Sequence, residues 1–503
     1  DKGNYSYREI NDIIIDISST PLEYNVMQYE KLTIQPQIKF TGQTIPEENL
    51  EYKWTIFNNH YSVSYSQVVG NSKEFDNVIT QNSSATSYTL VFDVKDKLSG
   101  ISAQQQFTVW INSKVISGWL VVHTNGGESD LDYIATTNSV PSLQENRRLQ
   151  NVYSLVNKSK MSGKATFVAG ARKNNTVINH VYIGTENELY KLNGKTFEQE
   201  LTFGSNMFTI VPTVRKPQSY EIGGTYSNYQ FLINNGQIHS IANQSAWETT
   251  FSYALLPNPA TLNAEKVELA PFIYMPEQFP STTRFGGVFY DNLGKRFVIV
   301  PYATTPTTML SSFNVQTGAL FDVNNIGKEI LHFEKGYNNY GYAVFKDQDN
   351  TGRWLYIMNL NVAMSNNMSV SMHNMQSLPQ IANARFYSTG NRGNVLLYAT
   401  DRDIFTYDYS GSNSAVQIND PFPAGEHITC MRIYKPGSVN NLGEANGALL
   451  YVATWNGTEG KLYEFSMNEA NGYLRNKVPL NIFDGFGEIL DMNFKIEGTG
   501  TGS

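Results

Sequence analysis

The stretch Ala448-Leu449-Leu450-Tyr451-Val452-Ala453-Thr454 begins a unit that recurs along this chain. It is a short apolar and aromatic run, and a polar turn separates it from the alternating stretch Lys461-Leu462-Tyr463-Glu464-Phe465. The runs around Tyr182 and Tyr398 are followed in the same way by alternating stretches at 188–192 and 403–407. We therefore predict a repeating unit that consists of a strand, a tight turn and a second strand.

Runs of this kind occur seven times after the first hundred or so residues. They lie at 118–122, 180–185, 229–233, 296–300, 354–357, 395–400 and 448–454. Their spacing, roughly 40 to 60 residues, is typical of the blades of a β-propeller. We therefore predict a propeller over residues 116–497 with seven blades. The irregular spacing leaves six and eight blades as alternatives.

Length and composition limit the possible classes of protein. A chain of 503 residues is too long for one ordinary core, which predicts at least two domains. Hydrophobic residues make up 41% of the chain, mean hydropathy is −0.35, and no apolar run reaches the length of a membrane-spanning helix. The net charge of −8 provides no basic surface for nucleic acid, so we expect no nucleic-acid partner.

The single cysteine and the two ends of the chain lead to three expectations. Cys430 has no second cysteine to pair with, and its alternating surroundings predict a buried thiol. The chain starts at Asp1 without a signal segment, so we expect it to be the mature part of a precursor. The Gly- and Thr-rich residues 498–503 are expected to form a flexible tail.

The first 115 residues have a different texture from the rest of the chain. Alternating stretches at 30–40, 50–57, 87–94 and 105–111 predict short strands. Trp54 lies in a central one, which is typical of an immunoglobulin-like sandwich with a buried tryptophan. The predicted fold class is therefore all-β, with a PKD/Ig-like sandwich at 1–115 followed by the propeller.

Several of these segments resemble a known family. The residues that carry the resemblance are Asp1–Asn11, Tyr52-Lys53-Trp54, Tyr88–Asp96, Ser117–Val122 and Ser129–Ile134. Together they resemble the PKD-like family lipoproteins of Bacteroidota. The resemblance implies a cell-surface protein of the outer membrane. Its lipid-bearing cysteine would precede Asp1, and its gene would lie beside a nutrient-uptake system of the SusC/SusD type.

Two stretches are less periodic than the rest, and one resembles part of a calcium loop. We expect the proline-rich residues 243–283 to be a long insertion between blades, and residues 361–381 to be irregular as well. Asp347-Gln348-Asp349-Asn350-Thr351-Gly352 begins like a calcium loop, but Met358 stands where the closing acid is needed, so we predict a hairpin turn. The seven histidines show no zinc spacing, and we predict neither a metal site nor a cofactor.

Aromatic residues provide the candidate binding site. Tyr337, Tyr340 and Tyr342 lie among turn-forming residues, and Trp455 follows a predicted strand into a turn. Aromatic rings beside Asn and Gly commonly hold sugars or peptides, so we predict that these four residues bind a ligand. No nucleophile elbow or phosphate-binding loop is present, so no catalytic residue is predicted.

The leading hypothesis is a non-enzymatic surface lipoprotein whose propeller rim binds an extracellular glycan, a peptide or an uptake-system protein. Its membrane contact would be made only through the N-terminal lipid anchor. One alternative is a hydrolase or lyase of extracellular polysaccharide, which a close pair of buried carboxylates near the propeller axis would favour. The other alternative is a purely structural or adhesive protein.

Overall fold

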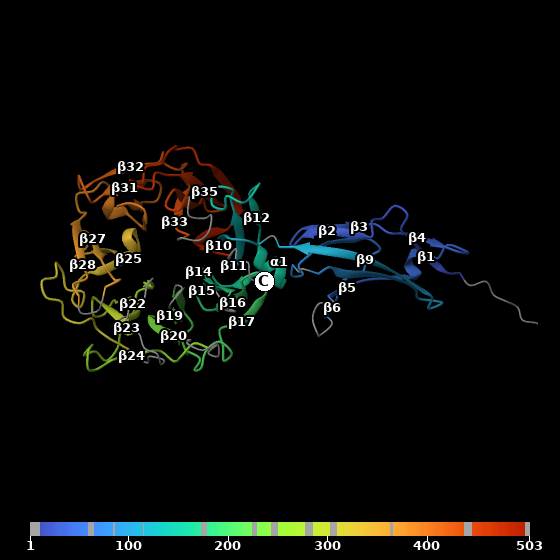
Figure 1. Ribbon diagram of the computed structural model, residues 1–503, viewed down its shortest axis with the longest axis horizontal. Coiled ribbons are helices and arrows are strands. Elements are labelled where there is room, and N and C mark those ends of the chain that lie inside the picture. The colour runs from blue at the N-terminus through green and yellow to red at the C-terminus, as the bar shows by residue number, and fades with distance from the viewer. Residues whose placement is uncertain are drawn as a thin grey trace, which may run out of the picture. The chain divides into compact units, whose positions relative to one another are not determined.

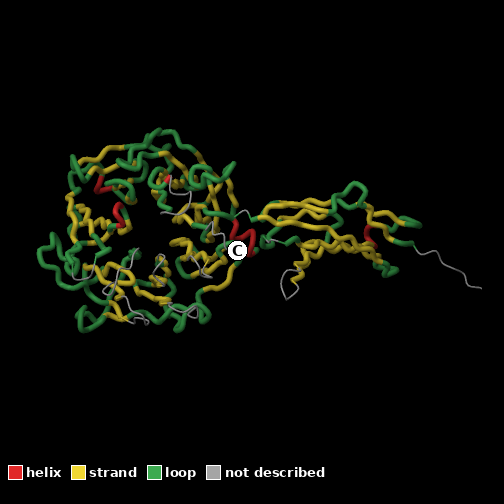
Figure 2. Tube along the Cα trace, viewed as in Figure 1, coloured by secondary structure: helices red, strands yellow, loops and turns green. Residues whose placement is uncertain are grey.

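The computed structural model describes residues 11–58, 65–83, 86–113, 115–172, 179–223, 229–242, 250–276, 285–301, 309–362, 366–436 and 445–497. The predicted tail at 498–503 and the start of the family resemblance at 1–10 lie outside them. The chain divides into two compact units, Asp1–Ile116 and Ser117–Ser503. Strands dominate both units (Figure 2), which confirms the all-β fold class. No helix in the described part is both long and apolar enough to cross a membrane.

The first unit is a β-sandwich. Its main sheet has the order β2 (Glu23–Met27), β9 (Ser102–Asn112), β8 (Tyr88–Asp96), β5 (Leu50–Asn58) and β6 (Tyr65–Gly70). Two further pairs are β3 (Lys31–Ile34) with β7 (Phe75–Val78) and β1 (Ile13–Asp16) with β4 (Gln37–Phe40). β2 runs parallel to β9, and the other pairs are antiparallel.

Trp54 fills the core of this unit, as the sequence predicts. Its side chain is fully buried and stacks on Phe92, with ring centroids 4.3 Å apart. The indole N–H donates to the carbonyl oxygen of Ser72 at 2.9 Å, so the one polar atom of the ring is satisfied inside the sandwich.

The second unit is a ring of seven sheets (Figure 1), which confirms the propeller and its seven blades. Five blades have four full strands each, in order from the axis outward. Blade 1 is β37 (Glu488–Lys495), β10 (Gly118–Asn125), β11 (Glu128–Ala135) and β12 (Arg147–Leu149). Blade 2 is β14 (Ala165–Arg172), β15 (Asn179–Thr185), β16 (Leu189–Asn193) and β17 (Gln199–Thr202).

Blade 5 is β25 (Glu329–Lys335), β26 (Gly341–Lys346), β27 (Arg353–Met358) and β28 (Ser369–Asn374). Blade 6 is β29 (Phe386–Thr389), β30 (Leu396–Ala399), β31 (Ile404–Asp408) and β32 (Ser414–Gln417). Blade 7 is β33 (His427–Ile433), β34 (Leu449–Trp455), β35 (Gly460–Ser466) and β36 (Asn481–Phe486).

Blades 3 and 4 are reduced at their edges. Blade 3 contains β18 (Pro217–Ile222), β19 (Tyr229–Asn234) and β20 (Gln237–Ala242), and blade 4 contains β22 (Phe285–Asp291) and β23 (Arg296–Pro301). In blade 4 the missing edges are single bridges, Tyr274 to Val288 on one side and Ser311 to Ile299 on the other.

The described part of residues 243–283 is therefore not an insertion outside the blades. Tyr274 forms one edge of blade 4, while Leu255 donates its N–H to Ile238 and forms the outer edge of blade 3. Prolines in this stretch cannot donate to a ladder, which explains why the pairing is reduced to isolated contacts. The irregular segment 361–381 likewise contains β28, the outer strand of blade 5.

The seven sequence runs do not all mark the same strand. Five of them lie on the second strand of a blade, but 296–300 lies on β23 and 354–357 on β27, which are third strands. The two middle strands of a blade are covered on both faces by neighbouring blades. Both therefore have the same apolar composition, and sequence alone does not distinguish them.

Antiparallel pairing gives the ring two distinct faces. Turns between first and second strands lie on one face, which we call the 1–2 face. Turns between second and third strands, and the connections from one blade to the next, lie on the other, which we call the 2–3 face. The short helix α1 (Val152–Asn157) belongs to the connection from blade 1 to blade 2, so it lies on the 2–3 face.

Ring closure joins the two ends of the second unit. The last strand, β37, pairs antiparallel with the first, β10, from Gly118 opposite Lys495 to Thr124 opposite Glu488. Ser117 secures the end of this pairing, because its hydroxyl oxygen accepts a hydrogen bond from the Glu497 N–H at 2.8 Å. Blade 1 is thus built from both ends of the propeller sequence.

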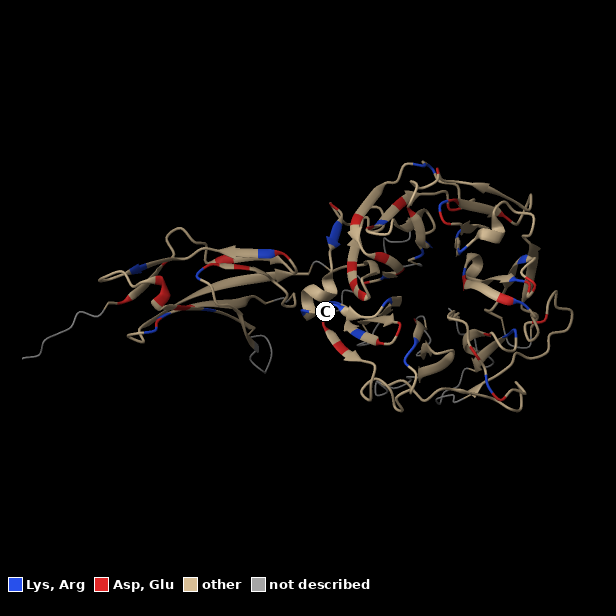
Figure 3. Cartoon of the chain, turned by 180° about the vertical axis from the view of Figure 1, so that it is seen from behind, with Lys and Arg blue, Asp and Glu red and all other residues tan. Residues whose placement is uncertain are grey.

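Charged residues on the inner strands link successive blades around the axis (Figure 3). Lys435, which follows β33, lies 2.6 Å from the Glu334 carboxylate of β25 and donates to the Lys335 carbonyl oxygen at 2.9 Å. Arg432 of β33 pairs with Asp491 of β37 at 2.8 Å, and the same carboxylate accepts the N–H of Val168 in β14. These contacts connect blade 7 with blade 5 and blade 7 with blades 1 and 2.

The Lys435–Glu334 pair should make the propeller sensitive to acid. Burial raises the pKa of the Glu334 carboxyl, but Lys435 and His332 outweigh burial and hold the pKa well below its ordinary value of 4.5. A lowered pKa in the folded state stabilises the protein above the ordinary pKa, and this contribution is lost as the pH falls through the folded-state value. We predict that the thermal unfolding midpoint falls less between about pH 5 and about pH 3 in Glu334→Gln than in wild type. Glu329→Gln, which alters the half-exposed pair with Lys346, is the control. Equal pH slopes for wild type and Glu334→Gln would contradict the prediction.

Candidate functional site

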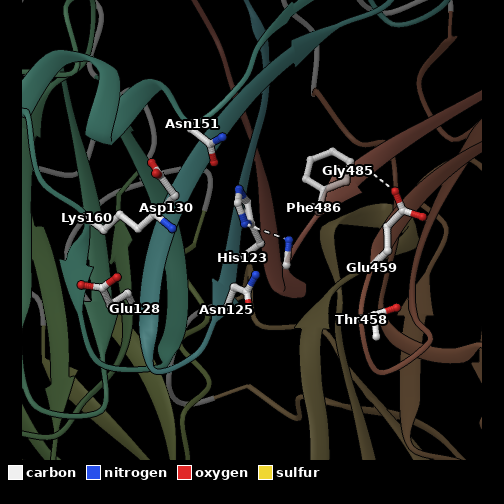
Figure 4. Close-up of a pocket in the computed structure, with 11 residues that line it drawn as sticks. His123, Asn125, Glu128, Asp130, Asn151, Lys160, Thr458, Glu459, Gly485 and Phe486 are labelled. Atoms are coloured by element: carbon white, nitrogen blue, oxygen red, sulfur yellow. Dashed lines mark hydrogen bonds between the residues drawn. The ribbon is translucent and has the colours of Figure 1, made fainter.

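A cavity of about 300 Å³ lies on the 2–3 face where blade 7 meets blade 1 (Figure 4). Its wall from blade 1 comes from the end of β10, the start of β11 and the connection that follows β12. Its wall from blade 7 comes from the turn between β34 and β35 and from the connection between β36 and β37. The lining residues are His123, Asn125, Glu128, Asp130, Asn151, Lys160, Thr458, Glu459, Gly485, Phe486 and Gly487.

Close backbone contact brings the two walls together at Gly487. A Cβ atom built on Gly487 would lie 2.3 Å from the Thr124 carbonyl oxygen, and one built on Gly460 would lie 2.1 Å from the Gly487 carbonyl oxygen. Only glycine fits at these two positions without a shift of backbone. The connection from β36 to β37 therefore packs directly against the end of β10.

Asp132 is the ionic anchor behind the cavity. Its carboxylate is 1% exposed, and it accepts hydrogen bonds from Arg148 Nε at 2.8 Å and from the Asn151 N–H at 2.8 Å. A second Arg148 nitrogen lies 2.8 Å from the same carboxylate. Arg148 also donates to the Asp484 carbonyl oxygen in β36, so this ion pair connects blade 1 to blade 7.

His123 is held in one tautomer by partners on both ring nitrogens. The Gly487 N–H donates to Nδ1 at 3.2 Å, which therefore carries no proton. Nε2 then carries the hydrogen and donates to Asp132 at 3.0 Å. Because both nitrogens are engaged and the side chain is buried, His123 positions the Gly487 connection and is not placed to act as a general base.

Phe486 contributes a ring that is largely covered. It is 3% exposed, and the Arg148 guanidinium lies 4.0 Å from its centroid. The edge of the ring meets His123 with centroids 5.6 Å apart. The aromatic surface that the cavity can offer to a ligand is therefore small.

The mouth of the cavity is polar and carries both signs of charge. Asn125, Glu128, Asn151 and Lys160 are exposed, and within the described part of the chain none of these four side chains has a hydrogen bond or an ion pair. On the other wall, Glu459 accepts the Gly485 N–H at 3.1 Å. The exposed groups are free to exchange their water for the hydroxyl, amide or amine groups of a ligand.

The four sequence-predicted binding residues do not form one site. Tyr342 is 2% exposed in the core between blades 5 and 6, where its hydroxyl accepts a hydrogen bond from Tyr409 at 3.0 Å. It therefore offers no open ring to a ligand. Tyr337 and Tyr340 are partly buried against the same core, in the turn between β25 and β26 on the 1–2 face.

Trp455 lies on the opposite face of the ring from the three tyrosines. It ends β34 and precedes the turn whose Thr458 and Glu459 line the cavity. Its aromatic ring thus indicated the correct turn in blade 7, but the residues that line the cavity were not predicted. The Gly-rich hairpin Asn125-Gly126-Gly127-Glu128 was the signal for the blade 1 wall.

Other candidate groups have structural roles. Asp347 accepts a hydrogen bond from the Trp354 indole N–H at 3.0 Å and pairs with Lys328, so the predicted hairpin between β26 and β27 is confirmed. Cys430 is buried, also as predicted, and burial raises the pKa of its thiol to about 12. Among the described residues, no group of three or more His, Cys, Asp or Glu side chains could hold a metal ion.

The carboxylates near the axis differ in their surroundings. Glu334 and Asp491 are each paired with a cation. Burial raises the pKa of Glu221 in β18, and its carboxylate accepts the Ile222 N–H at 3.2 Å. Glycosidases need such an acid together with a second carboxylate beside it. The described contacts of Glu221 do not include one.

We predict that Asp132 is essential to the wall between blades 1 and 7. Asp132→Ala leaves Arg148 and His123 without their buried acceptor, which should cost about 3–5 kcal/mol and lower the thermal midpoint by several degrees. The matched control is Asp401→Ala, whose ion pair with Arg385 is about half exposed and should be worth no more than about 1 kcal/mol. Differential scanning calorimetry measures both. A shift for Asp132→Ala no larger than that of the control would show that the network does not support the ring.

Comparison with known proteins gives one family match and three similar structures. A quinonprotein alcohol dehydrogenase-like protein from Bacteroides thetaiotaomicron is 14% identical, covers 94% of this chain and 98% of its own, and has a TM-score of 0.47. Apo AztD from Citrobacter koseri is 9% identical, covers 88% and 100%, and scores 0.35. A protein from Lactobacillus plantarum is 10% identical, covers 88% and 99%, and scores 0.29. No curated protein matches the sequence. The model of the PKD-like family matches residues 1–165, which confirms the resemblance over the sandwich and the first strands of the propeller.

Proposed function

We propose that this protein is a non-enzymatic binding protein of the cell surface, and that the cavity between blades 7 and 1 holds part of a glycan. The observation that carries the proposal is the cavity itself, with its unengaged amide, carboxylate and ammonium groups. Sugar hydroxyls both donate and accept hydrogen bonds, so they match a wall that presents both kinds of group. The volume is at the low end for ligand pockets, which suits one or two sugar units of a longer chain.

The same lining favours a glycan over an apolar peptide side chain. Anchoring an aromatic or aliphatic side chain requires a desolvated apolar pocket. Here the one aromatic ring, Phe486, is already covered by Arg148. The remaining lining consists of amides, carboxylates, a hydroxyl, an ammonium group and glycine backbone.

Binding without turnover fits the state of the buried titratable groups. His123 has both nitrogens engaged, and Asp132 is neutralised by Arg148. Neither is available to move a proton to or from a bound ligand. The hydrolase alternative would need Glu221 and a second carboxylate to act together near the axis, away from this cavity.

The cellular setting is proposed from the family match. The PKD-like resemblance over residues 1–165 supports a lipoprotein of the outer membrane that serves a SusC/SusD-type uptake system. In that setting the sandwich is a spacer between the lipid anchor and the propeller. The propeller presents the glycan, or another uptake-system protein receives it there.

A blocking substitution tests the binding site. Thr458 is exposed in the turn between β34 and β35. Thr458→Trp should fill the mouth and reduce glycan binding at least about tenfold on a glycan array and by calorimetry. Asp349→Trp, an exposed residue in the corresponding turn of blade 5, should bind like wild type. Incubation of each binding glycan with the wild-type protein measures turnover. Release of sugar products would favour the hydrolase alternative, and no binding at all would favour a structural role.

A second experiment tests the location. In cells that produce the full precursor, we predict that the protein incorporates labelled fatty acid and that external protease digests it on intact cells. Pull-down from detergent-solubilised outer membranes should recover the porin of an uptake system. A protein that carries no lipid and is protected in intact cells would overturn the proposed location without affecting the glycan site.

A further inference from the structure

We propose that the glycan held in this cavity carries a protonated amine, which makes the ligand an amino sugar in its unacetylated form. This inference rests on the proposed glycan function and deepens it. It follows from how the protein treats the carboxylates that line the cavity, compared with those it buries elsewhere.

Two carboxylates on β11 provide the contrast. Asp130 and Asp132 are each 1% exposed, and both point from the same face of the strand. Asp132 lies behind the cavity and has Arg148 as its cation. Asp130 lines the cavity, and it accepts only neutral donors, the Leu131 N–H at 2.9 Å, the Ser154 N–H at 3.1 Å and the Ser154 hydroxyl.

A buried carboxylate without a cation is costly, and a charged group that reaches it gains more than it would at the surface. The protein supplies a cation for Asp132 and none for Asp130 among the described residues. The open side of Asp130 is the cavity. A cationic group on the ligand would therefore complete the charge balance there.

The mouth of the cavity extends this acidic character. Glu128 and Glu459 come from opposite walls, one from blade 1 and one from blade 7 (Figure 4). Lys160 is the single cation of the lining, and it forms no ion pair with these groups among the described contacts. Three carboxylates against one ammonium group leave the lining with a net negative charge, because the assigned tautomer of His123 is neutral.

Among cations, the lining selects an amino sugar over a lysine or arginine side chain. A lysine side chain has a long apolar stem, which needs apolar surface along its length. The walls here are Asn125, Asn151, Thr458 and glycine backbone, which suit hydroxyl groups. A ring that carries both hydroxyls and an amine matches both parts of the site.

Two oligosaccharides that differ only at the amine provide the test. The probes are a glucosamine oligosaccharide and its N-acetylated counterpart of the same length, titrated into the wild-type protein by calorimetry. We expect the free amine to bind about tenfold more tightly at low salt, with the difference narrowing as salt is raised. Equal or tighter binding of the acetylated probe would overturn the inference.

Charge-neutral variants locate the effect. Glu128→Gln and Glu459→Gln keep the shape of the wall, and each should weaken amine binding about three- to tenfold while leaving the acetylated probe unchanged. Lys160→Gln removes a like charge and should tighten amine binding. Glu186→Gln, on the turn between β15 and β16 of the same face, is the control and should have no effect.

The outcomes separate this inference from the proposed function. If both probes bind equally and Thr458→Trp abolishes both, the glycan site stands and the amine inference is overturned. If a lysine oligopeptide competes at the same site more strongly than the glucosamine probe, the assignment to an amino sugar is wrong. If no glycan binds at all, both proposals are overturned.

Discussion

The pairing of β37 with β10 is the contact on which the propeller depends. It joins residues 118–124 to residues 488–495 and converts a row of sheets into a closed ring. Closing so long a loop costs conformational entropy, although the cost grows only slowly with length. In return, no blade is left with an uncovered apolar face, which explains why both middle strands of every blade can be apolar throughout.

A buried polar cluster on the 1–2 side of the same junction supports the closure. Glu464 of β35 is fully buried, and its carboxylate accepts hydrogen bonds from Tyr451 at 2.6 Å and Thr136 at 2.8 Å. Asn138 and Asn481 donate to its other oxygen. Thr136 and Asn138 belong to blade 1, and the others to blade 7. The junction is thus fixed by directional bonds as well as by apolar packing, which specifies one register for the last blade.

Much of the fold could be predicted from the sequence, because propeller blades are local. Each run and its following strand form a hairpin within about 20 residues, so periodicity along the chain reveals the repeat, and a single Trp54 reveals the sandwich core. The cavity could not be predicted in this way. Its walls unite His123 and Asp130 with Glu459 and Gly487, and no local pattern pairs residues so far apart. Tyr342 illustrates the opposite error, since turn-forming neighbours suggested exposure while the next blade covers its ring.

The cavity and the closure are consequences of one arrangement. Its walls come from the two blades that the last strand brings together, and Gly487 both leads into that strand and donates to His123 at the cavity wall. A ligand that bridges Glu128 and Glu459 would bind the closed ring and not the opened chain. By linkage, any such ligand stabilises the closed ring in proportion to the logarithm of its saturation. Binding at this place therefore reinforces the junction that creates the site, which no cavity within a single blade would do.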